Sequence, residues 1–233
     1  GGVMDATTIS TVLAATLLTL AAYALAVYAY RRTGWNLLLP VLTGATIVVA
    51  VLMLAAVPYS TYRSGAAVVS WLAGPATVAL ALPLYRQRHR LRGLVVPVVG
   101  ALLVGSVTAV VSAVGIAWLL GADWALMMSL APKSATMPVA IPVADRMGGS
   151  PSLSAVSVAL TGIASAVLSG GLFSLLGVRN DVVQGFALGE SAHAIGTARA
   201  VQISETAVGF SALAMGLNAI ATSVLVPLMV GLL

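Results

Sequence analysis

Apolar stretches of about 20 residues follow one another along most of this 233-residue chain. A helix of that length spans the roughly 30 Å hydrocarbon core of a bilayer. Only 7% of the residues are charged, whereas a soluble domain carries about a quarter. The apolar runs do not alternate with a period of two residues, which argues against a membrane β-barrel. The sequence therefore predicts an all-α, polytopic integral membrane protein.

We expect about eight membrane segments within a single integral membrane domain, residues 1–233. The segments are Thr8–Tyr30, Trp35–Val57, Ala66–Tyr85, Gly93–Leu120, Trp124–Val143, Leu153–Val178, Val182–Ala200 and Thr206–Leu233. The helices at about 8–57 suit a scaffold. The segments at about 66–85, 124–147 and 182–200 combine Pro or Gly with polar residues, so we expect broken or re-entrant helices there, as in transporters.

The basic residues give a test of this count. If all eight segments cross, one side holds Arg31, Arg32, Arg86, Arg88, Arg90, Arg92, Arg146 and Arg199, and the other side holds only Arg63 and Arg179. By the positive-inside rule the first side is cytoplasmic and both termini are outside. The bias does not exclude two re-entrant segments together.

A weak similarity between two segments of the chain suggests two internal repeats. Ala76–Gln87 and Ala135–Arg146 share Ala, Thr, Ala and Pro at the same four places. Repeats with broken helices at matching positions mark the binding site in many transporters. Four matches among small apolar residues can equally arise by chance.

Four ionisable residues lie within or at the edge of these segments: Lys133, Glu190, His193 and Arg199. Such a group costs at least about 2.5 kcal/mol inside a membrane, so it usually faces a cavity or a partner. Structural explanations compete in each case. Lys133 and Arg199 can extend to the interface, and His193 can be a neutral packing residue. Glu190, three positions before His193, can pair with it.

Together these features suit a pocket for a small carboxylate. A broken helix offers free N–H groups and a positive dipole end, hydroxyl groups add donors, and Lys133 or Arg199 adds a cation. The predicted substrate-binding residues are Lys133, Ser134, Thr136, Pro138, His193, Gly196, Thr197, Arg199 and Thr77. Glu190 or His193 could couple a proton, because imidazole titrates near physiological pH.

Several other functions find little support in the sequence. There is no cysteine, and His89 is far from His193, so we expect no metal, no cofactor and no disulfide. The net charge of +5 is explained by orienting loops rather than by nucleic-acid binding. Glu190 and His193 have no nucleophile beside them in the sequence, so we do not expect an enzyme.

Four motifs occur in order: GPATVALALPLY, PKSATMPVA, GGSPSL and GESAHAIGTARA. Together they resemble the CidB/LrgB family over nearly the whole chain. Glu190 stands where the family typically has a small or hydroxyl residue, and Met137 where threonine is frequent. Both departures fall in the candidate site and bear on the identity of the substrate.

The resemblance implies two kinds of function. Plant members form part of a plastid glycolate/glycerate translocator, and bacterial relatives are linked to pyruvate uptake. Other bacterial members are described as antiholin-like modulators of murein hydrolase activity. The sequence thus predicts a carrier of small monocarboxylates such as glycolate, glycerate, lactate or pyruvate, with an antiholin-like pore or regulator of lysis as the alternative. The expected setting is the bacterial plasma membrane, as a homodimer, with a small CidA/LrgA-type membrane partner as a further possibility.

Overall fold

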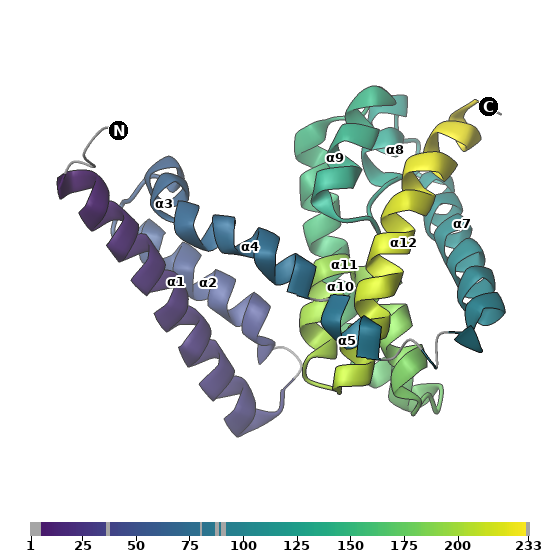
Figure 1. The fold of residues 1–233 in the computed structure, drawn as a ribbon. Helices are drawn as coiled ribbons and strands as arrows, with labels where there is room; N and C mark the ends of the chain where they lie inside the picture. The colour runs from purple at the N-terminus through teal and green to yellow at the C-terminus, as the bar shows by residue number, and fades with distance from the viewer. Residues whose placement is uncertain (1–5, 36–37, 80, 87–88, 90–91, 232–233) are drawn as a thin grey trace. The chain divides into compact units, whose positions relative to one another are not determined.

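A computed structural model describes residues 6–35, 38–79, 81–86, 89 and 92–231, apart from the side chains at 6, 7, 73, 76, 77, 81, 83 and 84 (Figure 1). All regular secondary structure in this part of the chain is helical, which confirms the predicted all-α class. The chain divides into two compact units, Gly1–Ala79 and Leu80–Leu233. We call these the N-terminal unit and the C-terminal unit. Whether they act as one integral membrane domain stays a prediction.

Among the described residues, four helices are long and apolar enough to cross a membrane. They are α1 (Ala6–Thr33), α7 (Val95–Leu119), α10 (Pro151–Leu175) and α12 (Glu205–Val230). Their outward faces carry large apolar side chains: Leu17, Val104 and Ile220 are each more than 60% exposed. Surfaces of this kind suit lipid rather than water. The chain is therefore a helical membrane protein, although these four helices do not establish the predicted eight crossings.

In the N-terminal unit, α1 packs against α2 (Pro40–Leu54) and α3 (Tyr59–Gly65). Small residues allow the close approach: a Cβ at Gly65 would lie 2.7 Å from the Thr11 carbonyl oxygen and 2.9 Å from Ala15 Cβ. This is the usual way in which membrane helices pack, because lipid provides no hydrophobic drive between them. The Thr19 and Tyr62 hydroxyls add a hydrogen bond of 2.9 Å.

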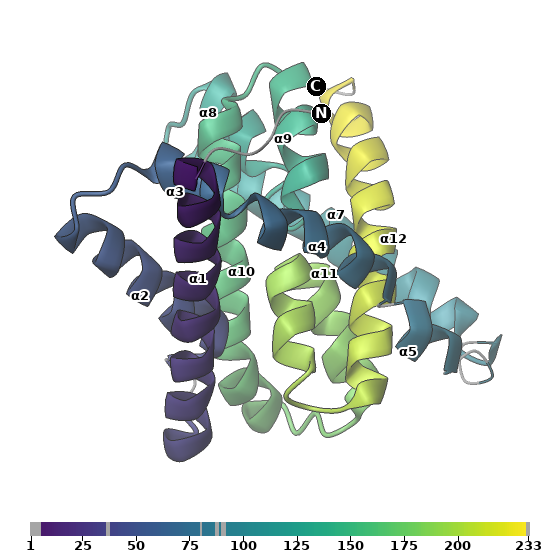
Figure 2. The ribbon, with the colours of Figure 1, turned by 60° about the vertical axis from the view of Figure 1, so that its left-hand side comes forward.

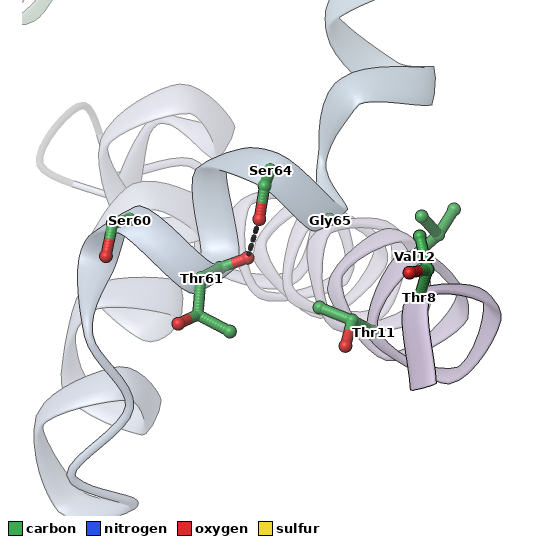
Figure 3. A pocket seen from close by; sticks show the side chains of 7 residues that line it. All are labelled: Thr8, Thr11, Val12, Ser60, Thr61, Ser64 and Gly65. Atoms are coloured by element: carbon green, nitrogen blue, oxygen red, sulfur yellow. Dashed lines mark hydrogen bonds between the residues drawn. The ribbon is translucent and has the colours of Figure 1, made fainter. Parts of the chain in front are cut away.

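A pocket of about 450 Å³ lies between α1 and α3 (Figure 3). Its walls carry the hydroxyl groups of Thr8, Thr11, Ser60, Thr61 and Ser64. The described residues of its lining include no charged side chain, so they offer an anion weaker binding than a pocket with a cation.

The predicted break at Gly74-Pro75 is not where the helix ends. Helix α4 (Ala67–Ala79) continues through Pro75, because the tertiary packing of a membrane helix can accommodate the lost N–H donor. Helix α5 (Ala81–Arg86) belongs to the C-terminal unit. An ion pair of 2.6 Å joins Arg86 to Glu205. Both side chains are more than half exposed, so this pair adds little stability.

The C-terminal unit combines the long helices α7, α10 and α12 with three elements of the predicted broken segments. These are α8 (Trp124–Leu130), α9 (Met137–Arg146) and α11 (Asp181–Ala200). Short polar side chains cap the N-termini of α8, α10, α11 and α12: Asp123, Ser150, Asn180 and Ser204 accept hydrogen bonds from the N–H groups of Leu126, Leu153, Val182 and Ala207. Such caps fix where each helix starts.

Helices α8 and α9 form a hairpin, which we call hairpin 1. Trp124 Nε1, at the start of α8, donates a 3.0 Å hydrogen bond to the carbonyl oxygen of Met147, just after α9. One continuous helix would hold these residues about 35 Å apart. Pro132 lies at the reversal and has no N–H to continue α8. The predicted segment 124–147 is therefore a helical hairpin rather than one straight helix.

Helix α11 also doubles back, and we call it hairpin 2. His193 has φ 43° and ψ −127° and interrupts the helix. A Cβ at Gly196 would overlap the Leu188 carbonyl oxygen, although eight residues of straight helix span about 12 Å. Only a glycine fits this close return. The predicted break at 182–200 is thus a reversal of the chain.

The two hairpins belong to opposite halves of α12. Ala131 and Met147 of hairpin 1 pack near Val226, whereas Leu188 and Ala200 of hairpin 2 pack against Ala207 and Val208. Figures 1 and 2 show α8 and α9 toward the C-terminal end of α12 and α11 toward its N-terminal end.

The reversal in α11 corrects one prediction about sidedness. Arg179 and Arg199 were expected on opposite sides, but they line one cavity of about 330 Å³. A segment that doubles back returns its second end to the side of its first. The charge bias computed for eight full crossings therefore does not hold for the C-terminal unit.

Candidate functional site

The tips of the two hairpins are held by one side chain, Asn218 of α12. Its Nδ2 donates hydrogen bonds to the carbonyl oxygens of Ser134 (2.9 Å) and Glu190 (3.0 Å). Ser134 lies in the tip of hairpin 1 and Glu190 just before the reversal of hairpin 2. Two segments that are distant in sequence therefore meet at one amide group.

The carbonyl group of Asn218 is occupied as well. Its Oδ1 accepts hydrogen bonds from Ser106 Oγ of α7 (2.9 Å) and from Thr222 Oγ1 (3.4 Å). A carboxamide has two N–H donors and two lone pairs, and all four are used. Helix breaks leave carbonyl groups unpaired, at a cost of several kcal/mol each in hydrocarbon. Asn218 removes that cost at both tips and is itself only 1% exposed.

This meeting point lies at mid-depth. Asn218 is near the middle of α12 and Ser106 near the middle of α7, and both helices have the length and composition of membrane spans. Interrupted helices that meet at this level are typical of the binding sites of secondary transporters.

A cavity of about 590 Å³ opens beside the hairpin tips, and we call it the central cavity. Its walls come from α7, the tip of hairpin 1, α10 and α11. Two charged side chains line it, Lys133 and Glu190. Six hydroxyl groups surround them, those of Thr108, Ser134, Thr161, Ser165, Ser169 and Ser191. The central cavity can therefore hydrate or bind a small polar solute.

The two charges of the central cavity are not paired with each other. In the described part of the chain, no ion pair joins Lys133 to Glu190 and no hydrogen bond of the Lys133 ammonium group occurs. Glu190 Oε1 is buried without a hydrogen-bond partner. The carboxylate lies against Gly105 of α7, where a Cβ would overlap it. The Lys133 ammonium group is thus available to a solute that enters the cavity, and the Glu190 carboxyl group, which lies close to Ser106, has no cationic partner in the described part of the chain.

His193, Gly196 and Thr197 lie outside the lining of the central cavity. The His193 ring packs on Gly162 of α10, and its Nε2 donates to the Val158 carbonyl oxygen at 3.0 Å. Thr197 Oγ1 donates to the His193 carbonyl oxygen (3.1 Å) and lies 2.9 Å from Ser211 Oγ. These groups hold the reversal of hairpin 2 in place. The contacts of His193 are those of a packing residue, which is one of the two alternatives given for it above.

The remaining predicted residues are dispersed. Thr136 starts α9 without a side-chain cap bond, and Pro138 is exposed in the first turn of α9. Arg199 hydrogen-bonds to Gln202 and lines the separate cavity that contains Arg179. Thr77 belongs to α4 of the N-terminal unit, and its side chain lies outside the described part. Of the predicted substrate-binding set, Lys133 and Ser134 line the central cavity, together with the proton-coupling candidate Glu190.

Sequence reasoning missed Asn218, Ser106 and Ser211. Each is a buried polar residue within an apolar helix. Asn218 carries a usable signal, because a lone carboxamide in a long apolar run requires a hydrogen-bonding partner. Among the described residues, no group of three or more acidic or histidine side chains could hold a metal ion.

Comparisons with known proteins agree over nearly the full length of the chain. "Uncharacterized protein YxaC" of Bacillus subtilis is 41% identical over 216 residues, which cover 93% of this chain and 94% of that protein. "Uncharacterized protein YwbG" of Bacillus subtilis is 34% identical, with coverage of 88% and 91%. "Antiholin-like protein LrgB" of Bacillus subtilis is 27% identical, with coverage of 93% and 94%.

No solved structure matches this chain. The sequence profile described as the LrgB-like family matches residues 19–232, which confirms the resemblance seen in the motifs. The chain belongs to the LrgB-like family.

Proposed function

We propose that this chain is a secondary transporter of small monocarboxylates, of the class of glycolate, glycerate, lactate and pyruvate. One observation supports this function most: two hairpin tips meet at mid-depth beside a cavity that contains the only lysine of the chain. A pore formed between subunits would need neither interrupted helices nor an unpaired internal charge.

The proposed binding step uses Lys133 and the surrounding hydroxyl groups. The ammonium group neutralises the carboxylate of the acid, and Ser134 Oγ and its neighbours replace part of its hydration shell. Access then alternates between the two membrane faces as the hairpins separate and close. Glu190 is the better placed of the two proton-coupling candidates, because it lines the cavity whereas His193 Nε2 is engaged by a backbone carbonyl.

An antiholin-like role is the second candidate. A specific observation favours it: several full-length relatives are named "Antiholin-like protein LrgB". None of the relatives' printed names given above mentions a transported acid, so the comparisons favour this candidate over the carrier. Here the chain would regulate murein hydrolase export and cell lysis as a pore or as a regulator of one. A location in the bacterial plasma membrane, a homodimeric state and a small CidA/LrgA-type partner belong to the proposal.

Reconstitution into liposomes distinguishes the two candidates. A carrier gives saturable uptake of a labelled monocarboxylate into vesicles that retain an entrapped dye. The Lys133→Gln variant should reduce this uptake by at least about tenfold, because a charged hydrogen bond to the acid is lost. Arg63→Gln, at an exposed cation of α3, is the matched control and should behave as the wild type.

Graded leakage of dye and solutes without discrimination would support a pore and contradict the carrier. Tight vesicles without uptake of any candidate acid would also defeat the carrier and leave the regulatory form of the antiholin-like role.

A further inference from the structure

The central cavity contains one cation and one anion, and we propose that it selects zwitterions: small molecules of the α-amino-acid type, with a carboxylate for Lys133 and an ammonium group for Glu190. This inference rests on the carrier part of the proposed function and replaces the plain monocarboxylate by a carboxylate that also carries an ammonium group. The observation that motivates it is that Lys133 and Glu190 line one cavity without an ion pair between them.

Electrostatics at this depth favour a ligand with both charges. An unpaired charge away from water is costly, and two opposite charges lower that cost when they pair with each other. Lys133 and Glu190 do not pair, so each retains its capacity for a ligand group. A plain monocarboxylate would satisfy Lys133, leave the Glu190 carboxylate without a cationic partner and be repelled by it. A zwitterion satisfies both residues and leaves the cavity neutral.

Gly105 explains how the two charges are kept apart. A Cβ at this position would overlap Oε1 of Glu190, so the glycine creates the space that the carboxylate occupies against α7. The carboxylate is thereby drawn to the α7 wall of the cavity, away from a pairing with Lys133 at the tip of hairpin 1. A ligand can then fit between the two groups.

The size and the other lining groups agree with this assignment. About 590 Å³ falls within the usual range of small-molecule sites, roughly 300–1,000 Å³. Hydroxyl groups donate and accept hydrogen bonds, so those of Ser134 and Thr161 suit either end of a zwitterion. The cavity wall formed by Leu168, Leu172 and Phe173 can receive an apolar side chain.

Three molecules of nearly equal shape test the proposal: L-alanine, L-lactate and propionate. At the carbon next to the carboxylate, alanine carries an ammonium group, lactate a hydroxyl group and propionate only hydrogen. Equilibrium binding of each labelled compound is measured on purified protein that elutes as a single folded species. We expect alanine to bind at least about tenfold more tightly than propionate, since an added charged hydrogen bond is worth that factor or more.

Variants test whether Glu190 is responsible for the preference for alanine over propionate. Glu190→Gln should reduce alanine affinity by about tenfold or more and leave propionate affinity unchanged or higher. Glu205→Gln, at an exposed carboxylate, is the matched control and should alter neither. Gly105→Ala keeps the carboxylate but displaces it, so it should also lower the preference for alanine. This second variant tests the proposal even if Glu190→Gln fails to fold.

The outcomes separate this inference from the proposed function. If propionate or lactate binds in a Lys133-dependent manner and alanine does not, the zwitterion inference is wrong and the monocarboxylate carrier stands. If Glu190→Gln and Gly105→Ala both bind alanine as tightly as the wild type does, Glu190 has no part in selection and the inference is also wrong. If none of the three compounds binds to folded wild-type protein, both proposals fail.

Discussion

A single carboxamide, that of Asn218, donates a hydrogen bond to one backbone carbonyl oxygen in each hairpin tip. The Asn218→Leu variant has similar volume but no N–H group, so the carbonyl oxygens of Ser134 and Glu190 lose their donors. Each buried unpaired group costs about 1–3 kcal/mol. We expect the midpoint temperature of thermal unfolding in detergent to fall by about 5 °C or more.

Ser223→Ala provides the control for this measurement, because Ser223 is exposed on the same helix and bonds only to the Ile220 carbonyl oxygen. It should unfold near the wild-type midpoint. An Asn218→Leu protein as stable as the wild type would show that the tips do not depend on this amide.

The sequence identifies some residues of the site and not others for physical reasons. Lys133 and Glu190 are detectable because a charge in an apolar segment almost always has a role. Asn218 is less conspicuous, since an amide carries no charge. A neutral packing role for His193 was among the alternatives, but its partner, the Val158 carbonyl oxygen, could not be predicted because it is 35 positions away in the sequence. A residue's type can be read locally, whereas its partner depends on the fold.

At the scale of helices, the close backbone contact between α11 and α12 leads to a second prediction. A Cβ at Gly189 would overlap the backbone of Ser211, whereas nothing lies within 4 Å of a Cβ at Gly216. Gly189→Ala should therefore reduce the yield of folded protein sharply. Gly216→Ala should be neutral or stabilising by up to about 1 kcal/mol, since alanine favours helix. Size-exclusion profiles and unfolding midpoints measure both, and equal behaviour of the two variants would contradict the contact.

Hairpin 1 gives a prediction about topology. The chain has no cysteine, so single cysteines can be introduced before and after the hairpin, as Ala122→Cys and Asp145→Cys. Because Trp124 and Met147 are in contact, a membrane-impermeant maleimide should label both positions from the same side. Labelling from opposite sides would mean that residues 124–147 cross the membrane. The cysteine-free protein is the control for background labelling.

The sequence predicted where helices form better than it predicted in which direction the chain continues after each one. Long apolar runs predicted α1, α7, α10 and α12 nearly to their ends, because length and hydropathy are local properties. The segments at about 124–147 and 182–200 were also correctly predicted to be interrupted. Whether the chain continues or returns after an interruption depends on contacts such as Trp124 with Met147, which no local pattern encodes.

At the level of the whole molecule, the two hairpins determine which positions of the C-terminal unit lie on the same side of the membrane. Helix α10 is long enough to cross, and hairpin 2 returns to the side from which it starts. Cysteines introduced as Ser174→Cys and Val201→Cys should thus share one side, opposite to positions 122 and 145. Both wild-type residues are exposed. Labelling in right-side-out and inside-out vesicles measures this, and eight full crossings would instead separate positions 174 and 201.

The glycine contacts at positions 185 and 189 have a consequence for motion. Side-chain interfaces can slide by changes of rotamer, but backbone pressed on backbone, as at Gly185 on Ala207 and Gly189 on Ser211, resists such slippage. We expect the first half of α11 and α12 to travel as a single body, with the Asn218–Glu190 bond inside it. The bond from Asn218 to Ser134 then crosses the seam between moving parts. It is the contact that should rupture first on opening, and a spin-label distance between α9 and α12 that stays constant during turnover would contradict this.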